Sequence, residues 1–405
     1  MSGGDSAVTG ARIEVTAIEI VAAGERARVQ ATVGSGAASE TWWFGVPWDR
    51  AGDLQTAGNP FLVATLPLAA AVGGTVAIDA PVDARLLHNL QRVLEIWRGW
   101  YPWVRPVRLA CDNVLPASAA TRMTAAFLSG GVDSLFTALR PRDAAAPDER
   151  VRIDEFITVH GFDIPLANEA AFQRLRERHR GVAGELGCSH MDIVTNLRET
   201  RLREVSWGWI AHGCALAAAA LVLESRYGRV LIPATGGYHD PHPWGSHPLT
   251  DPLLSTARTT LVHDGAAFTR TAKIRLLTES PHAPGVLRVC WESRSDENCG
   301  RCGKCLRTMA TLECMGALAR FTTFPAQQVD VRALSRVRCT ESWDYREFGD
   351  LHELARRAGR PDIARAARQA MRRSRRRERW HHAVTKLARV VRSVVTLKGA
   401  GRPRS

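Results

Sequence analysis

Residues 125–135, with the sequence Ala-Ala-Phe-Leu-Ser-Gly-Gly-Val-Asp-Ser-Leu, constrain the fold of this chain more than any other stretch. An apolar run over residues 123–128 stops at a serine and two glycines, and helix-forming residues follow from Leu135. Glycines reach backbone angles that are closed to other residues, so they permit a sharp turn. The pattern therefore predicts a buried strand, a tight turn and a helix.

This turn is suited to hold a phosphate. A glycine-rich turn can direct several backbone N–H groups at one anion, and the helix behind it adds the positive end of its dipole. Ser129 and Ser134 can donate hydroxyl hydrogen bonds to phosphate oxygens, and the carboxylate of Asp133 can ligate Mg²⁺. The loop lacks the Gly-Lys-Ser/Thr ending of the Walker type. We therefore expect a nucleotide phosphate at residues 129–134.

The hexapeptide Ser-Gly-Gly-Val-Asp-Ser resembles the PP-loop of the ATP pyrophosphatases. Those enzymes cleave ATP between the α and β phosphates and pass AMP to a substrate, while the loop holds the departing pyrophosphate. The resemblance implies that ATP and Mg²⁺ are cofactors and that Asp133 and Ser134 take part in catalysis. The cofactor-binding residues that it implies in the loop are Ser129, Gly130, Gly131, Val132, Asp133 and Ser134.

After the loop, strand-like and helix-like segments alternate, which is typical of a doubly wound, mainly parallel α/β sheet. The expected strands cover residues 153–159, 191–197 and 230–234, and the expected helices cover 168–186 and 207–227. Ligands of such sheets lie beyond the carboxyl ends of the strands. The loops that we expect to converge on one crevice are 129–134, 160–163, 196–198 and 235–240.

Several residues of these loops are candidates for the site. We assign His160, Gly161, Gly236 and Gly237 to cofactor binding and Arg198 to catalysis, as a cation near the pyrophosphate. A hydrogen-bonded structural role for His160 is an equal alternative. The proline-rich segment 237–256 contains imidazoles and carboxylates, and we interpret it as a substrate-contacting loop or a lid; a metal site is the alternative.

Four of the nine cysteines cluster near residue 300. They are separated by eight, two and two residues, and glycines at positions 300 and 303 allow tight turns between them. Four thiolates can close a tetrahedral zinc site with no open position. An iron–sulfur cluster and free thiols are the alternatives. The predicted metal ligands are Cys290, Cys299, Cys302 and Cys305.

The order of a PP-loop, a helix with Thr271-Ala272-Lys273 and a late cysteine cluster looks like that of the 7-cyano-7-deazaguanine synthases. Those enzymes use ATP and ammonia to convert a deazapurine carboxylate to an amide and then a nitrile, with a zinc ion on four cysteines. The resemblance covers residues 123–315. It implies an adenine nucleotide alpha hydrolase-like (HUP) fold and an ATP-dependent, adenylating C–N ligase. About 120 residues before this region and about 90 after it have no counterpart in those synthases.

The implied chemistry begins with attack of a substrate carboxylate or amide oxygen on the α-phosphate of ATP, after which ammonia displaces AMP. In addition to Arg198, we assign Lys273 to catalysis, as a second cation that neutralises pyrophosphate. A sulfur nucleophile, as in PP-loop thiolation enzymes, is one alternative, with Cys188 or Cys214 as the reactive thiol. A non-catalytic nucleotide- or RNA-binding module is another.

We predict four parts of the chain: an α+β domain of unknown role at residues 1–120, an ATP-binding domain with a zinc knuckle (290–305) at 121–320, a helical extension at 321–370 and a basic tail at 371–405. The expected elements of the first part are strands at 13–20, 27–33, 41–46, 75–78 and 107–110 and helices at 59–71 and 83–100. Those after residue 321 are a strand at 328–331 and helices within 350–379.

The net charge of +13 belongs mainly to the tail, because residues 371–405 contain twelve basic residues and one glutamate. A basic amphipathic helix there suits RNA, an acidic membrane surface or an acidic partner protein, and a solvated tail is the plain alternative. No apolar run approaches the ~20 residues that span a bilayer, and no signal peptide begins the chain. We expect a cytoplasmic protein, with a small-molecule acceptor and an ammonia donor as partners; a homodimer stays open.

Overall fold

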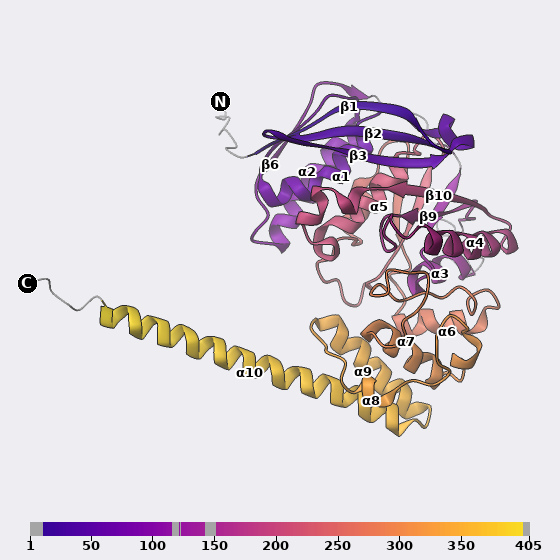
Figure 1. The fold of residues 1–405 in the computed structure, drawn as a ribbon, viewed down its shortest axis with the longest axis vertical. Coiled ribbons are helices and arrows are strands. Elements are labelled where there is room, and N and C mark those ends of the chain that lie inside the picture. Colours follow the sequence, from indigo (N-terminus) through magenta and orange to yellow (C-terminus); the bar gives the residue numbers. More distant parts are fainter. Residues whose placement is uncertain (1–10, 116–120, 122, 142–150, 400–405) are drawn as a thin grey trace, which may run out of the picture. The chain divides into compact units, whose positions relative to one another are not determined.

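The computed structural model of the protein describes residues 11–115, 121, 123–141 and 151–399, with side chains up to Trp380 (Figure 1). The chain divides into two units, Met1–Asn298 and Cys299–Ser405. Unit 1 combines helices with one large sheet, so the predicted mixed α/β class is confirmed. The four predicted parts of the chain stay a prediction.

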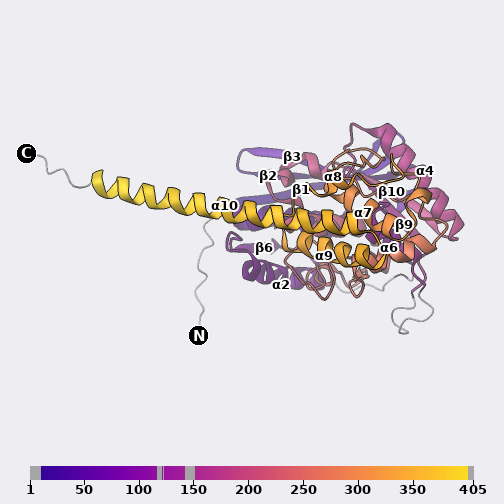
Figure 2. The ribbon, with the colours of Figure 1, turned by 90° about the horizontal axis from the view of Figure 1, so that it is seen from below.

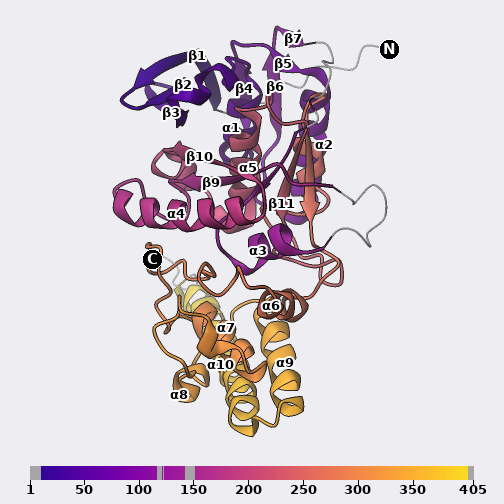
Figure 3. The same cartoon turned by 90° about the vertical axis from the view of Figure 1, so that its right-hand side faces the viewer.

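Within the described residues, ten strands of unit 1 form one sheet in the order β12-β11-β8-β9-β10-β3-β2-β1-β4-β6. Six of the nine neighbouring pairs are parallel, as predicted for the sheet. The order β1, β2, β3, β10, β9 can be followed from top to bottom in Figure 3. The strands are β1 (Arg12–Ala23), β2 (Arg26–Ser35), β3 (Ala38–Pro47), β4 (Gly74–Ile78), β6 (Val107–Cys111), β8 (Thr124–Phe127), β9 (Glu155–His160), β10 (Ser189–Thr195), β11 (Arg229–Pro233) and β12 (Thr260–Asp264).

Two short strands, six α-helices and several short 3₁₀ or π-helical turns complete the regular structure described for unit 1. The short strands, β5 (Val82–Asp83) and β7 (Val114–Leu115), pair with each other. The helices are α1 (Asn59–Val72), α2 (Ala84–Trp100), α3 (Val132–Leu139), α4 (Glu169–Glu185), α5 (His212–Leu221) and α6 (Arg270–Glu279).

The sequence explains why β8 lies inside the sheet. All four of its side chains are buried, and β9 on one side and β11 on the other both run parallel to it. Strands of a parallel sheet that are covered on both faces have continuous apolar sequences, as Thr-Ala-Ala-Phe does here. The chain proceeds from β8 to β9 and β10 and then returns to β11, so the direction of strand addition reverses next to β8. Ligand sites of open α/β sheets lie at such a reversal.

The first strands extend this sheet. β2 alternates between buried and half-buried side chains, as the period of two in its sequence predicts. β3 pairs with β10 in an antiparallel register that places Phe44 opposite Thr195. Trp42 and Trp97 are buried in the core, so these tryptophans serve packing, whereas Trp48 and Trp103 are partly exposed.

A buried charged cluster joins the amino-terminal end of β9 to the segment before β11. Arg226 donates hydrogen bonds of 2.8 and 3.0 Å to the Glu155 carboxylate, and the Tyr227 hydroxyl donates another. Burial alone would raise the pKa of Glu155, but the hydrogen bonds from Arg226 and Tyr227 outweigh it and lower that pKa. Because a buried carboxylate without these donors would be costly, the cluster fixes how the two segments meet.

Unit 2 is helical in the described residues. Its α-helices are α7 (Gly303–Cys314), α8 (Val331–Leu334), α9 (Ser342–Arg357) and α10 (Pro361–Gly399). Figures 1 and 2 both show α10 running beside α9 and then beyond the ends of α7, α8 and α9. Phe348 and Leu351 of α9 and Ile363 and Ala367 of α10 are buried, which accounts for the pairing of these helices.

The structure corrects three expectations. Residues 328–331 do not form a strand; instead Asp330 caps α8 by accepting a hydrogen bond from the N–H of Ala333, and this local bond competes with an extended backbone. The predicted helix 207–227 is a π-helical turn, Trp207–Ala211, followed by α5, which ends at Leu221. β12 was not predicted, because its five residues, Thr-Leu-Val-His-Asp, show no clear period.

Among the described residues, no helix has the length and apolar character required to cross a bilayer.

Gly161 offers a test of the turn after β9. Its φ is +99°, and a Cβ there would lie 1.9 Å from the Thr195 carbonyl oxygen. We expect Gly161→Ala to lower the free energy of unfolding by roughly 2–5 kcal/mol, because it adds both strain and a clash. The matched change Gly181→Ala, in α4 with no atom within 4 Å, should stabilise by about 0.5–1 kcal/mol. Urea unfolding measures the free energy of unfolding of both variants. Equal changes in the two variants would contradict the requirement for glycine at position 161.

Candidate functional site

The loop between β8 and α3 forms a tight turn closed by its own serines. Gly130 has a φ of +76°, which favours glycine. The Ser134 hydroxyl donates to the Gly131 carbonyl at 3.1 Å and accepts from the Ser129 N–H at 3.1 Å, while Ser129 Oγ lies 3.2 Å from it. Val132 is buried and begins α3. The predicted strand, turn and helix are therefore confirmed, and the predicted loop residues lie together.

Other segments of unit 1 pack tightly against the turn at Gly130. A Cβ at Gly130 would lie 3.0 Å from Nε2 of His179 and 3.1 Å from the Val286 carbonyl oxygen. The Arg288 N–H donates to the Gly130 carbonyl at 2.8 Å. Position 130 thus requires glycine for its backbone angle and for space.

A buried ion pair lies at the start of α3. Lys273 of α6 is 1% exposed, and its Nζ donates to Asp133 at 2.9 Å and to the Ala234 carbonyl at 2.5 Å. Arg270, one turn earlier on α6, lies 3.2 Å from the other Asp133 oxygen. Two cations from one helix therefore contact the start of α3, and one of them also contacts the end of β11. The structure brings together the predicted residues Asp133 and Lys273.

Sequence reasoning missed Arg270. The sequence pattern that could have identified it is the three-residue spacing between Arg270 and Lys273. This spacing follows Thr269, whose side chain caps α6 by accepting a hydrogen bond from the Ala272 N–H. Residues three apart in a helix lie on one face, so one cation at the site predicts the other.

His160 is a packed core residue. It is 1% exposed, its ring stacks on Phe172 at 4.2 Å, and its Nε2 lies 3.0 Å from the Pro165 carbonyl oxygen. Burial is the main cause that lowers the pKa of His160. The contacts fit the structural alternative for this histidine. The neighbouring Gly161 makes the turn that leaves β9.

Arg198 lies among aromatic rings near the ends of β9 and β10. Its guanidinium lies 4.6 Å from the Trp207 ring centroid and donates to the Phe162 carbonyl at 2.9 Å. Burial lowers the pKa of Arg198. These contacts differ from those of Lys273, so the two predicted cations occupy different surroundings.

A row of aromatic rings begins beside Arg198 and contains Phe162, Trp207, His212 and Trp244. Ring centroids of Phe162 and Trp207 are 5.0 Å apart, those of His212 and Trp244 are 5.8 Å apart, and Trp207 lies 6.4 Å from His212. Trp207 begins the π-helical turn before α5, and such turns are frequent at functional sites. The row was not predicted, since its members come from three separate segments.

Gly236 and Gly237 follow β11 and line a small pocket together with His242 and His247 of the 237–256 loop and His263 of β12. His263 Nδ1 lies 2.7 Å from the buried Asp251 carboxylate. Burial is the main cause that lowers the pKa of His247 to about 4, so this imidazole is neutral at pH 7. The loop is irregular apart from a short 3₁₀ turn at Asp251–Leu254, as predicted.

Two histidines, the buried His179 and the half-buried His190, lie near the turn between β8 and α3. Thr158 Oγ1 lies 2.8 Å from His179 Nδ1 and 2.9 Å from His190 Nε2, and its hydroxyl is 3.1 Å from the Leu128 carbonyl oxygen. Burial lowers the pKa of His190 to about 4 and that of His179 well below its usual value. The loop therefore rests on neutral imidazoles.

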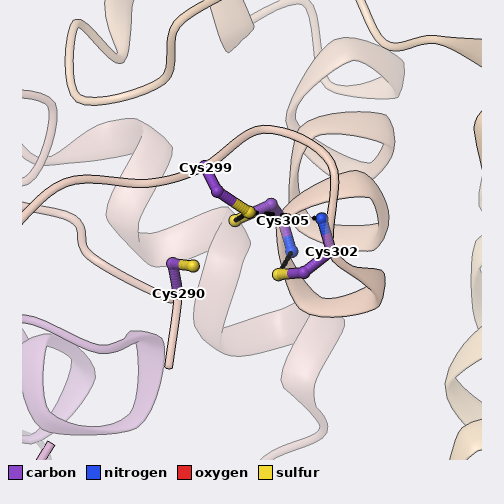
Figure 4. A group of neighbouring side chains, drawn as sticks. All are labelled: Cys290, Cys299, Cys302 and Cys305. Atoms are coloured by element: carbon purple, nitrogen blue, oxygen red, sulfur yellow. Dashed lines mark hydrogen bonds between the residues drawn. The ribbon is translucent and has the colours of Figure 1, made fainter. Parts of the chain in front are cut away.

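The four clustered cysteines form a group that could bind a metal ion. Their sulfur atoms lie within 4.8 Å of one another (Figure 4). Sγ of Cys299 and Sγ of Cys305 are 3.9 Å apart, close to the edge of about 3.8 Å that Zn–S bonds of about 2.3 Å give a tetrahedron. The N–H groups of Ser293, Cys302 and Cys305 point at sulfurs of Cys290, Cys299 and Cys302 at 3.3–3.4 Å. Such donors stabilise thiolates, so the residues fit a metal. Among the described residues, no other group of three or more His, Cys, Asp or Glu ligands has this geometry.

The scattered cysteines Cys188 and Cys214 have different surroundings. Cys188 Sγ lies 3.1 Å from the Ile153 carbonyl oxygen, and Cys214 is 1% exposed. Burial raises the pKa of both thiols, which keeps them protonated and weakly nucleophilic.

Comparison with known proteins gave no match: no family model, curated protein or solved structure is similar to this chain. The functional argument therefore rests on the geometry described above and on the motifs of the sequence.

The half-buried His190 predicts how stability depends on pH. The unfolded chain protonates this residue near pH 6.5 and the folded chain only near pH 4, so the unfolded state takes up the proton first as the pH falls. Between pH 7 and pH 5, we expect His190 to account for a loss of about 2 kcal/mol in the free energy of unfolding. His190→Gln, which retains a hydrogen-bonding group, should remove that part of the loss. An unchanged slope of urea stability against pH would contradict a neutral His190.

Proposed function

We propose that this protein is a PP-loop enzyme of the adenine nucleotide alpha hydrolase-like (HUP) superfamily, similar to the 7-cyano-7-deazaguanine synthases. It uses ATP to adenylate a carboxylate or amide oxygen of an acceptor and lets ammonia displace AMP. The observation that carries the proposal is the contact of Lys273 with Asp133 and the Ala234 carbonyl beside the Gly130 turn. That contact gathers positive charge at the carboxyl ends of parallel strands, where such sheets bind ligands.

The first step forms a bond between the acceptor oxygen and the α-phosphorus and breaks the bond from that phosphorus to the bridging oxygen of pyrophosphate. The loop N–H groups, Ser129 and Ser134 bind the departing pyrophosphate. Lys273 and Arg270 stabilise its growing negative charge from fixed positions, so little reorganisation is needed during the reaction. Asp133 is the residue that would hold Mg²⁺, which neutralises phosphate charge when bound.

In the second step, the nitrogen of ammonia attacks the acyl carbon of the adenylate. The bond from this carbon to the phosphate-linked oxygen breaks, AMP leaves with its electron pair, and the attacking nitrogen loses a proton. Adenylation makes this possible because AMP is a far better leaving group than hydroxide. The aromatic row supports a planar acceptor, since stacked rings bury large flat surfaces, and Arg198 supplies a cation beside it.

The cysteine cluster, in this proposal, is a structural zinc knuckle. Four thiolates leave no coordination position for a substrate, so the metal would stabilise the fold and take no part in the reaction. The described cysteines are all free of disulfides, which supports a reducing compartment such as the cytoplasm.

Sulfur transfer receives no support from the available thiols. Cys188 and Cys214 are the scattered candidates, and burial raises the pKa of each. A reactive cysteine has a lowered pKa and an accessible sulfur.

The decisive assay incubates the purified chain with ATP, Mg²⁺, ammonium and candidate carboxylates, including 7-carboxy-7-deazaguanine, and measures AMP and pyrophosphate. We expect Lys273→Met to lower the rate of AMP formation by roughly 10²–10³-fold, because it removes a preorganised cation. The matched control Arg275→Gln alters an exposed residue of the same helix and should change the rate less than about twofold.

Two measurements keep this test independent of folding and of the acceptor. Calorimetry should detect binding of inorganic pyrophosphate to the unmodified chain and weaker binding to Ser129→Ala, which changes an exposed loop residue. A chain that binds neither pyrophosphate nor ATP would contradict the proposed function.

The metal proposal is tested by elemental analysis. We expect about one zinc ion per chain and loss of that zinc from Cys302→Ser under a chelator, because three remaining thiolates bind more weakly. Cys111→Ser is the control, since this residue lies in β6 outside the cluster. Iron with a brown colour, or no metal in the unmodified chain, would refute a zinc knuckle.

A further inference from the structure

α10 carries a stripe of arginines that no described residue neutralises. Arg365, Arg372, Arg376 and Arg379 are exposed, and their spacings of seven, four and three residues place them on one face of the helix. None of the four has an ion pair or hydrogen bond with another residue in the described part of the chain. Two other exposed arginines of α10 have partners on α9: Arg368 contacts His352 at 3.2 Å, and the Arg375 guanidinium lies 5.2 Å from the Tyr345 ring centroid. Arg373 and Arg377 are also exposed and lie beside the stripe.

The opposite face of α10 is already covered. Ile363, Ala367, Ala370 and Ser374, spaced four, three and four residues apart, are buried. Ser374 Oγ accepts from the Cys339 N–H at 3.0 Å. Since packing fixes this face within unit 2, the arginine stripe is held outward.

The sequence continues the same face with apolar residues. Trp380 lies four residues after Arg376 and is 72% exposed. The helical backbone extends to Gly399, and apolar residues recur in this sequence after further intervals of four, three, four and three residues. Together with Trp380 these positions are Val384, Leu387, Val391 and Val394. The combined stripe, arginines first and apolar residues second, spans about 44 Å of helix, from Arg365 to Val394.

We propose that this stripe docks α10 on the surface of an anionic lipid membrane. Lipid phosphates neutralise the arginine half, and the boundary of the acyl chains accepts the apolar half. A nucleic acid would satisfy only the arginines and leave the apolar half in water. A second copy of the chain in parallel would oppose arginine to arginine, and an antiparallel copy would oppose arginine to apolar residues. An anionic membrane satisfies both halves, and it does so independently of the proposed enzymatic activity.

Sedimentation of the full chain with vesicles tests the proposal. We expect binding to mixed phosphatidylglycerol–phosphatidylcholine vesicles and little binding to phosphatidylcholine alone. Raising the salt from about 0.1 M to about 1 M shortens the screening length from about 10 Å to about 3 Å and should weaken binding strongly. The double change Arg372→Gln/Arg376→Gln should lower the partition coefficient on the order of 30-fold.

The matched control is Arg356→Gln/Arg357→Gln, which removes the same charge from exposed positions of the neighbouring α9. It should alter binding less than about threefold, because the effect depends on the stripe and not on net charge. Leu387→Gln/Val391→Gln should weaken binding at both salt levels, and circular dichroism checks that the helices remain.

Four outcomes would overturn the proposal. Equal binding to neutral and anionic vesicles, or equal losses in the stripe variant and the α9 control, would remove the arginine stripe from the interaction. Tighter binding to tRNA than to vesicles, unaffected by Leu387→Gln/Val391→Gln, would assign the stripe to a nucleic acid. A dimer that these same changes dissociate, without vesicle binding, would assign it to a second copy.

Discussion

The buried ammonium of Lys273 is the constraint on which the arrangement of the site depends. A charged group removed from water is costly unless it is paired and hydrogen-bonded. Lys273 meets this requirement with the Asp133 carboxylate and the Ala234 carbonyl. These partners lie at the start of α3 and just after β11, so one side chain of α6 fixes the distance between two neighbouring strand ends. The same pairing holds positive charge in a fixed position beside the turn between β8 and α3.

The sequence predicted the parts of the site that depend on neighbouring residues. The turn at residues 129–134 is encoded by adjacent glycines and serines, and the structure contains it. The pair of Lys273 and Asp133 joins residues 140 positions apart; both were named, but no local pattern predicts their contact. Arg270 was missed although its three-residue spacing from Lys273 on α6 is a local signal. His160 shows the opposite case, since a polar residue after a strand proves to be packed against Phe172.

Sequence patterns also could not predict how the first strands pair with the rest of the sheet. The alternation in β2 and β3 predicts strands but does not say what they pair with. In the structure β3 pairs with β10, and Thr195 Oγ1 donates to the Trp43 carbonyl at 2.7 Å while Asn196 Oδ1 accepts from the Trp43 N–H at 3.0 Å. The amino-terminal residues therefore position the turn after β10, which leads directly to Arg198. In unit 1 they complete one sheet and support the turn that follows β10.

A single irregular segment supports both the turn between β8 and α3 and Cys290, the first of the four clustered cysteines. The Arg288 N–H donates to the Gly130 carbonyl at 2.8 Å, and Cys290 follows two residues later. Asn298 fixes this segment by accepting from the Val289 N–H at 2.8 Å and donating to the Leu287 carbonyl at 2.9 Å. The segment contains no helix or strand, so its position depends on these hydrogen bonds. Within unit 1, the turn at Gly130 and the backbone at Cys290 therefore depend on the same support.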